Sequence, residues 1–104
     1  MAANLILEFD GVTAAEYHAV NEELGIDPVS GEGNWPEGML SHSAGLNESG
    51  DLVVTEMWSS IQDQEEFMHS RLSDALVKGG ILNPPSSVTW IDVISHHNLE
   101  SLHD

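Results

Sequence analysis

The chain has 104 residues, which is enough for one domain with a modest hydrophobic core. It carries 18 acidic residues and only 2 basic ones, Arg71 and Lys78, so its formal net charge is -16. This shortage of cations excludes nucleic acid as a partner and disfavours anionic membrane surfaces. The acidity is typical of a well-solvated surface, and it favours neutral, aromatic or cationic ligands over anionic ones.

The chain contains no cysteine, which excludes disulfides, thiolate metal sites and a cysteine nucleophile. The first residues, MAANLILEFDG, have no basic region, and Glu8 and Asp10 interrupt their apolar run, so no signal peptide is predicted. No apolar segment approaches the roughly 20 residues that a membrane-spanning helix needs. We therefore expect a soluble, cytoplasmic protein.

In the first third of the chain, a strand, a helix and a loop are predicted. Apolar residues alternate in the strand: Leu5, Leu7 and Phe9. Thr13 and Glu16 form a capping-box pattern that begins a helix, and Gly25 ends it. Residues 26–38 are rich in glycine and proline and predict a long loop, of the kind that is often functional.

The rest of the chain predicts two strands, a second helix and a last strand. Residues 39–46 and 52–58 read as strands joined by the short turn NESG. Ser59 or Ser60 can cap the next helix, which Gly79 ends and whose buried stripe is Ile61, Met68, Leu72, Ala75 and Leu76. Residues 88–94 form the last strand, and a polar tail follows.

The resulting order, βαββαβ, predicts an α+β, ferredoxin-like fold for residues 1–95, with residues 96–104 as a C-terminal tail. Such a fold has a four-stranded antiparallel sheet with two helices on one face. Here both faces of the strands carry apolar residues, and the helices can cover only one of them. The sequence therefore predicts a homodimer in which a second sheet covers the other face.

Three segments carry a resemblance to a known family: GVTAAEYHAVNEELG, WPEGMLSHSAG and VVTEMWSSIQDQEEFMHSRL. In the last of them, a strand ends in Val-x-x-x-Trp-Ser-Ser and leads into a helix that carries Phe67. Over residues 4–95 the chain resembles the dimeric α+β barrel superfamily, in particular the antibiotic biosynthesis monooxygenases and their small bacterial relatives. The resemblance implies two sheets packed face to face and a cavity between sheet and helices in each subunit.

Members of this superfamily include cofactor-independent oxygenases of polyketides, haem-degrading enzymes, cyclases and decarboxylases. The haem-degrading branch uses an Asn on the first strand and a Trp and a His on the second helix. Asn4 matches the first, but Phe67 and Val77 stand near the other two positions. The resemblance therefore implies no haem, and we expect no cofactor.

His42 is the candidate catalytic residue. If NESG closes a simple hairpin, His42 lies across from Thr55, among Leu40, Ala44, Val53 and Met57. An imidazole there is either desolvated and neutral, and so usable as a base, or hydrogen bonded and inert. Glu56 would then lie on the opposite face of the hairpin, either facing solvent at an edge or paired, with Arg71 as the candidate partner in a structural ion pair.

Five other residues are candidates for ligand binding. Tyr17 and Asn21 lie toward the apolar side of the first helix, where they can hydrogen bond a ligand or satisfy the backbone. Trp35 can cover the cavity mouth or contact a second subunit, and Trp58 can stack on a ligand ring. His69 lies at the flank of the second helix and is either surface-exposed or in the pocket.

The tail contains His96, His97 and His103, and a histidine-rich tract can bind metals. Their spacing matches no closed zinc site, so no dedicated metal site is predicted. The sequence also lacks a phosphate-binding loop and a nucleophile elbow.

Two functions remain open from the sequence. The leading one is an enzyme that resembles cofactor-independent monooxygenases and acts on a small aromatic or polyketide-like molecule. His42 would take a proton from a phenol or enol, and the resulting carbanion would react with oxygen without flavin or metal. The alternative is a non-catalytic dimeric module that binds a ligand or is only structural.

Overall fold

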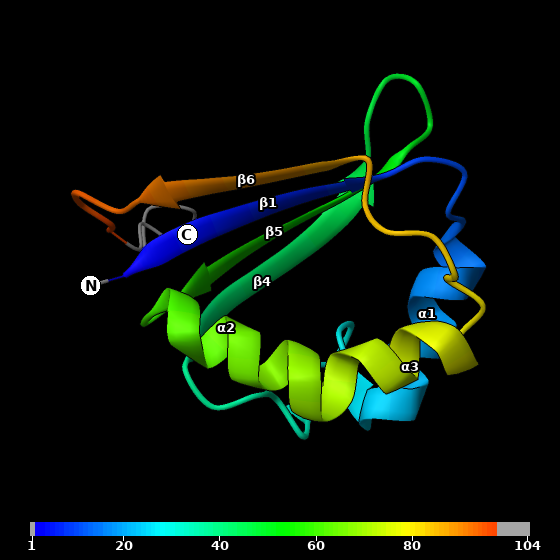
Figure 1. The fold of residues 1–104 in the computed structure, drawn as a ribbon, viewed down its shortest axis with the longest axis horizontal. Coiled ribbons are helices and arrows are strands. Elements are labelled where there is room, and N and C mark those ends of the chain that lie inside the picture. Colours follow the sequence, from blue (N-terminus) through cyan, green and yellow to red (C-terminus); the bar gives the residue numbers. More distant parts are fainter. Residues whose placement is uncertain (1, 98–104) are drawn as a thin grey trace.

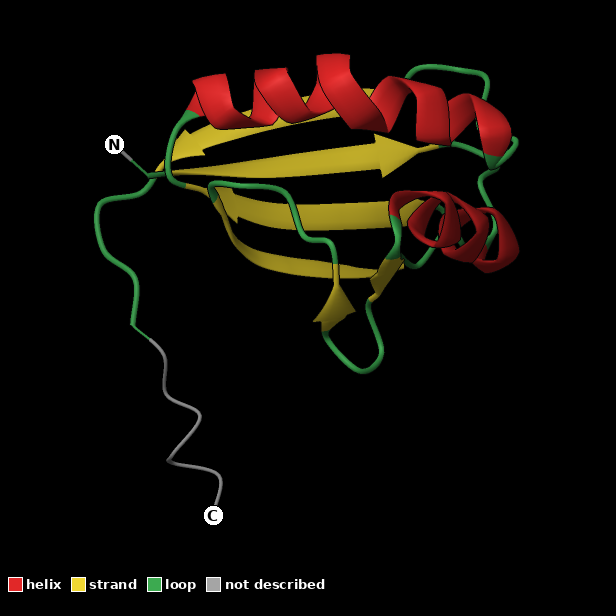
Figure 2. Cartoon of the chain, turned by 90° about the horizontal axis from the view of Figure 1, so that it is seen from below, coloured by secondary structure: helices red, strands yellow, loops and turns green. Residues whose placement is uncertain are grey.

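The computed structural model describes residues 2–97, which form one four-stranded antiparallel sheet with the helices on one face (Figures 1 and 2). The strand order is β4-β5-β1-β6. The main elements are β1 (Ala3–Phe9), α1 (Ala14–Leu24), β4 (Met39–Leu46), β5 (Leu52–Trp58), α2 (Ile61–Phe67), η1 (Met68–Leu72), α3 (Ser73–Lys78) and β6 (Ser87–Asp92). The predicted ferredoxin-like α+β fold is confirmed. No helix within residues 2–97 combines the length and apolarity needed to cross a membrane.

The first helix begins and ends where the sequence predicts. Thr13 accepts a hydrogen bond from the backbone N–H of Glu16, and the Glu16 side chain accepts one from the Thr13 N–H, which completes the capping box. Gly25 adopts the left-handed conformation, with φ of 75°, and its N–H binds the last carbonyls of the helix.

The second helical stretch, Ile61–Lys78, is not one regular α-helix. Its middle section, η1, is a π turn in which the Ser73 N–H binds the carbonyl of Met68, five residues earlier. In a regular helix Phe67 and Leu72 would point about 140° apart, but here both line the same cavity. The predicted stripe is wrong at Ile61, which is 41% exposed, whereas Phe67 and Gln64 are buried.

The segment predicted as a loop contains a small hairpin formed by β2 (Ile26–Asp27) and β3 (Glu32–Gly33). Figure 2 shows it beside the main sheet. Arg71 binds both ends of this hairpin, because the Arg71 guanidinium donates to the carbonyl of Leu24 at 2.9 Å and to that of Asn34 at 2.6 Å. The predicted pairing of Arg71 with Glu56 is therefore wrong.

The register of the β4–β5 hairpin also differs from the prediction. The loop is Asn47–Asp51, one residue longer than NESG, because the Asn47 side chain accepts the N–H groups of Ser49 and Asp51. His42 therefore pairs with Glu56 and not with Thr55. A one-residue shift moves every side chain to the other face of a strand, so His42 and Glu56 share the face that the helices cover.

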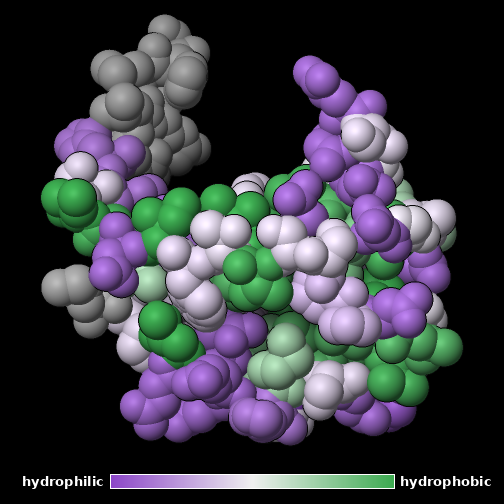
Figure 3. Space-filling model, turned by 45° about the horizontal axis from the view of Figure 1, so that its top comes forward, coloured by the Kyte–Doolittle hydropathy of each residue, from purple (hydrophilic) through white to green (hydrophobic). Residues whose placement is uncertain are grey.

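The two faces of the sheet differ in character. The covered face carries the core, including Leu5 and Trp58, which are the largest fully buried side chains. The open face, part of which is seen in Figure 3, is mixed. By the strand register its apolar members are Ile6, Val53, Met57 and Ile91, and its polar members include Asn4, Ser41, Ser43, Thr55 and Thr89. The open face is therefore less apolar than the sequence pattern suggested.

Candidate active site

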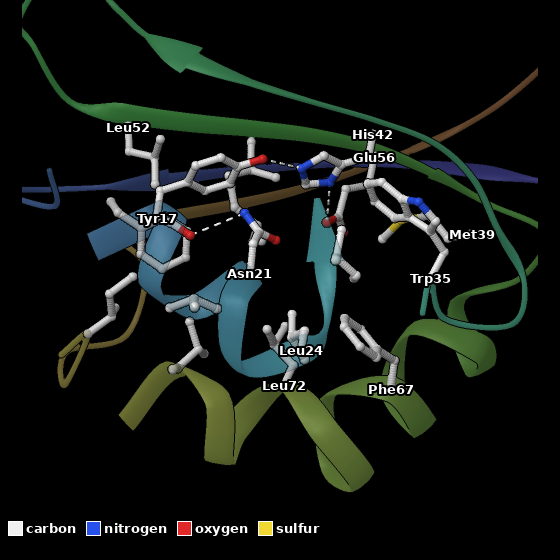
Figure 4. Close-up of a pocket in the computed structure, with 17 residues that line it drawn as sticks. Tyr17, Asn21, Leu24, Trp35, Met39, His42, Leu52, Glu56, Phe67 and Leu72 are labelled. Atoms are coloured by element: carbon white, nitrogen blue, oxygen red, sulfur yellow. Dashed lines mark hydrogen bonds and ion pairs between the residues drawn. The ribbon is translucent and has the colours of Figure 1, made fainter. Parts of the chain in front are cut away.

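A cavity of about 60 Å³ lies between the sheet and the helices (Figure 4). Its wall is mainly apolar, with contributions from both layers: Leu7, Phe9, Val20, Leu24, Ile26, Met39, Leu52, Val54, Phe67, Leu72, Leu76 and Ile81. Five residues with polar side chains complete the wall: Tyr17, Asn21, Trp35, His42 and Glu56. The cavity is thus a mostly apolar space with polar groups on α1, β4, β5 and the loop before β4.

A chain of hydrogen bonds runs through these polar groups. The Tyr17 hydroxyl lies 2.7 Å from His42 Nε2, and His42 Nδ1 lies 3.1 Å from Glu56 Oε2. The other carboxylate oxygen of Glu56 accepts the indole N–H of Trp58 at 3.0 Å. Figure 4 shows the first two contacts, which join α1 to β4 and β4 to β5. The four side chains form one continuous unit that we call the Tyr17–Trp58 relay.

The acceptors in the relay determine which nitrogen of His42 carries its hydrogen. A carboxylate can only accept, and Glu56 therefore requires a hydrogen on Nδ1. In the neutral imidazole, Nε2 is then free to accept the hydrogen of the Tyr17 hydroxyl. This arrangement of hydroxyl, imidazole and carboxylate follows the same logic as a catalytic triad, with a phenol in the first position.

Burial raises the pKa of Tyr17 above its ordinary value of 10.0, and the nearby charge of Glu56 raises it further, while a hydrogen bond with Asn21 opposes them. The phenol is therefore neutral at physiological pH and can donate to His42. Asn21 is itself buried, and its amide donates to the backbone carbonyl of Tyr17 at 3.1 Å. Asn21 thus fixes the part of α1 that carries the phenol.

Two surface grooves of about 430 Å³ each adjoin the relay. The first, which we call the tryptophan groove, is lined by Pro28, Gly31, Trp35, Met39, Leu40, Ser41 and His42. The second, the tyrosine groove, is lined by Ala14, Tyr17, His18, Pro28, Val29, Leu52 and residues 42–46. His42 borders the cavity and both grooves, so it is the side chain at which the three spaces meet.

Of the predicted site residues, the structure brings Tyr17, Asn21, Trp35 and His42 together. Trp35 packs against His42 with ring centroids 5.5 Å apart, and its indole N–H donates to the Gly31 carbonyl at 2.9 Å. The two other candidates lie elsewhere. Trp58 is fully buried behind Glu56 and does not line the cavity, and His69 is exposed on η1.

Glu56 is the site residue that the sequence did not reveal. It is 7% exposed and sits on the covered face, where it orients His42. The signal that could have found it is Asn47, since an Asn at the start of a turn favours a loop closed by its own side chain. That loop sets the register that places Glu56 opposite His42.

No group of three metal-binding side chains occurs within residues 2–97. His96 and His97 are exposed in this part of the chain, and His103 lies outside it. The prediction about the histidine-rich tail is therefore untested.

The fold and the site together define a class: a small ferredoxin-like α+β protein with a hydrogen-bonded relay of side chains beside an apolar cavity. The sequence matches no protein-family model and no curated protein. Its structure, however, is similar to that of solved proteins over most of its length.

Three such structures are similar to this chain. A Chloroflexus aurantiacus protein assigned to the antibiotic biosynthesis monooxygenases has a TM-score of 0.66 at 16% identity, covering 95% of this chain and 99% of that one. Rv0793 from Mycobacterium tuberculosis has a TM-score of 0.65 at 18% identity, covering 94% and 100%. A monooxygenase from the Streptomyces coelicolor gene ActVA-Orf6, solved with nanaomycin D, has a TM-score of 0.52 at 20% identity, covering 93% and 89%. The chain therefore has the fold of the antibiotic biosynthesis monooxygenase-like proteins.

Proposed function

We propose that the protein is a cofactor-independent, monooxygenase-like enzyme that acts on a small aromatic or polyketide-like phenol or enol. The observation that carries this proposal is the Tyr17–Trp58 relay, which ends at a phenol and an imidazole where the cavity and both grooves meet. A ready proton acceptor at a mostly apolar site suits the ionisation of a neutral, weakly acidic ligand.

The relay suggests how the proton moves. Both nitrogens of His42 already have partners, so a ligand can reach Nε2 only through Tyr17 or by displacing it. We assign the first route: the ligand's hydroxyl gives its proton to the Tyr17 oxygen while Tyr17 passes its own proton to Nε2. Glu56 then stabilises the imidazolium that forms. Tyr17 and His42 would be the catalytic residues and Glu56 the positioning residue.

The ligand's ring fits the grooves better than the cavity. A pocket for a drug-sized ligand has about 300–1,000 Å³, a range that includes each groove but excludes the cavity of about 60 Å³. Of the two, the tyrosine groove is the one that Tyr17 lines, so it is where a ligand's hydroxyl can reach the phenol, while Trp35 lines the tryptophan groove. The nanaomycin D bound to the Streptomyces coelicolor protein supports a polycyclic ligand of this kind.

No cofactor is needed if the ionised ligand itself reduces oxygen. Anthrone illustrates the balance: its enol tautomer loses the hydroxyl proton, the resulting carbanion reacts with O₂ at the former CH₂ carbon, and anthraquinone and water form. One oxygen atom enters the new carbonyl, the other leaves as water, and the four electrons come from the CH₂ carbon. The protein has to take up the first proton, hold the carbanion away from water, and return the proton to the oxygen that leaves as water.

The test is turnover of anthrone, followed by oxygen uptake and anthraquinone formation. We expect His42→Gln to lower kcat by about 10²- to 10⁴-fold, the usual share of general base catalysis. His69→Gln is the matched control, because His69 is exposed and outside the cavity. Equal rates for His42→Gln and the native chain, with both folded, would refute the proposal.

One observation favours the alternative, a module that binds a ligand without turnover. Among residues 2–97 every buried side-chain polar atom already has a hydrogen-bond partner, so the relay can be purely structural. Calorimetry with nanaomycin D distinguishes the two functions. Binding without oxygen uptake, together with a large loss of stability in His42→Gln, would favour the module.

We also propose that the chain forms a homodimer through the open face of the sheet. Ile6, Val53 and Ile91 lie there among small Ser and Thr side chains, and Ile91 is 46% exposed. A second sheet packed on this face would remove these groups from water. Sedimentation should give a dimer that Ile6→Lys dissociates and that Val77→Lys, on the exposed side of α3, leaves intact. A monomer at all concentrations would disprove the dimer.

A further inference from the structure

We infer that the cavity between sheet and helices is a binding site for dioxygen. This inference rests on the proposed function for its catalytic meaning, but the binding site itself is tested independently. Three features of the described residues support it: the size of the cavity, the satisfied polar groups of its wall, and its position relative to the grooves.

The size of the cavity excludes most other occupants. A cavity of about 150 Å³ is known to hold benzene or xenon, and one of about 10–15 Å³ holds a single water. The volume of about 60 Å³ found here is too small for an aromatic ring but sufficient for a diatomic molecule. The aromatic ligand and the contents of this cavity must therefore be different molecules.

The wall of the cavity offers a water molecule few hydrogen-bond partners. A buried water needs two to four polar partners. Tyr17, His42 and Glu56 already bind one another, and the Asn21 amide donates to the backbone. The Trp35 indole N–H donates to the Gly31 carbonyl, and the remaining wall is hydrocarbon contributed by both layers, including Val54 and Leu76. Such a space favours an apolar gas over water, because the gas loses no hydrogen bonds on entry.

The position of the cavity suits a reaction between its contents and a ligand in a groove. Tyr17, His42 and Leu52 line both the cavity and the tyrosine groove, and Trp35, Met39 and His42 line both the cavity and the tryptophan groove. A carbanion formed at the Tyr17–His42 pair therefore has the cavity directly behind that pair. Oxygen held there meets the reactive carbon from the protein side, away from solvent.

Methyl NMR under oxygen pressure tests the site without any substrate. Dissolved O₂ is paramagnetic and speeds the relaxation of nearby methyl groups, and nitrogen at equal pressure is the diamagnetic control. We expect larger oxygen-induced relaxation at the buried methyls of Val54 and Leu76 than at the exposed methyls of Val29 and Leu82. The inference would be overturned by relaxation that is no larger at the buried methyls than at the exposed ones. Water cross-peaks to the cavity methyls would also overturn it.

Two double variants, of which the first fills the cavity and the second does not, provide a matched comparison. Val54→Ile with Leu76→Phe places four extra carbon atoms at the wall and should abolish the excess relaxation at the cavity methyls that remain, such as those of Leu7, Val20 and Leu24. Val77→Ile with Leu82→Phe makes the same changes at exposed positions that do not line the cavity, and should leave the excess unchanged. If the first pair does not fold, Val54→Ile alone should reduce the excess. Persistence of the excess in a folded cavity-filled variant would overturn the site.

Kinetics with anthrone then separate the site from the proposed function. In an active enzyme the cavity-filling pair should raise the KM for oxygen by about fourfold to fifteenfold, since each methylene-sized group moved out of water changes a binding constant by about fourfold. The KM for anthrone should not change. Excess oxygen-induced relaxation at the cavity methyls without any anthrone turnover would support the oxygen site and count against the proposed oxygenase function. Anthrone turnover by the cavity-filling pair with an unchanged KM for oxygen would overturn the catalytic role of the cavity.

Discussion

Replacing Glu56 by Gln removes the charge at the centre of the Tyr17–Trp58 relay while keeping the shape of the side chain. Glu56 is 7% exposed and accepts two hydrogen bonds, from His42 at 3.1 Å and from Trp58 at 3.0 Å. A Gln oxygen can still accept the indole N–H. Its NH₂ group, however, then faces His42 Nδ1 and can only donate.

The cost in stability follows from the two hydrogen bonds. A hydrogen bond to a charged group contributes about 1.5–3 kcal/mol and a neutral one about 0.5–1.5 kcal/mol. Exchanging two of the first kind for two of the second destabilises the fold by about 2–3 kcal/mol. For a domain of this size that lowers Tm by about 8–24 °C. Glu48→Gln, in the exposed β4–β5 loop, is the matched control for loss of one negative charge.

The effect on His42 is larger than the effect on stability. With a donor facing Nδ1, the neutral imidazole must carry its hydrogen on Nε2, and it can no longer accept a hydrogen from Tyr17. In a Ser-His-Asp triad the corresponding exchange lowers kcat by about 10⁴-fold. We expect Glu56→Gln to lower anthrone turnover by about 10²- to 10⁴-fold and to leave KM nearly unchanged.

Nitrogen-15 NMR of the His42 ring measures the change of tautomer directly, whether or not the enzyme is active. The native protein should show the hydrogen on Nδ1, and Glu56→Gln should show it on Nε2. If both proteins have the same tautomer, or if the folded variant keeps native turnover, Glu56 does not orient His42 and the reasoning from the relay fails.

Three further predictions concern single positions. Tyr17 is the only tyrosine, and because burial raises its pKa, the tyrosinate absorbance should develop with a midpoint above pH 10. The unfolded chain then ionises first, so stability should fall as pH rises through 10 toward the folded pKa, and urea titrations of Tyr17→Phe should lack this part of the loss. Arg71→Met removes two hydrogen bonds to backbone carbonyls, and we expect a loss of about 1–3 kcal/mol in thermal unfolding and faster amide exchange over residues 26–36; unchanged exchange would contradict this role. Gly38→Ala and Gly50→Ala both place a side chain at positive φ, which costs about 1–2 kcal/mol. Only at Gly38 would the new Cβ also meet another side chain, that of Asp63, within 2.7 Å. Calorimetry should therefore show the larger loss for Gly38→Ala, and equal losses would refute the contact.

Local signals in the sequence predicted the first helix almost completely. Thr13, Glu16 and Gly25 act on backbone groups within four residues of themselves, so their effect can be read without knowing the fold. The same is true of the strand in which Leu5, Leu7 and Phe9 alternate, since all three are buried on one face. These elements determined the order βαββαβ and hence the fold class.

The second helical stretch shows where local signals fail. Its amphipathic period predicts a regular α-helix, but the structure inserts a π turn that brings Phe67 and Leu72 to one cavity. A regular helical period also places Ile61 in the buried stripe, where it does not lie. Which residues face the core here depends on packing against the sheet, and that information is not local.

The sequence by itself determined the elements of this protein, its charge and the presence of a histidine on a strand, because these depend on residues close together in the chain. Only the tertiary structure decided what His42 contacts. Tyr17 and Glu56 lie 25 and 14 residues from it, and one additional loop residue, held by the Asn47 side chain, moves Glu56 onto the face that His42 occupies. Because side chains alternate between the two faces of a strand, that single residue determines whether the imidazole meets a threonine or a carboxylate.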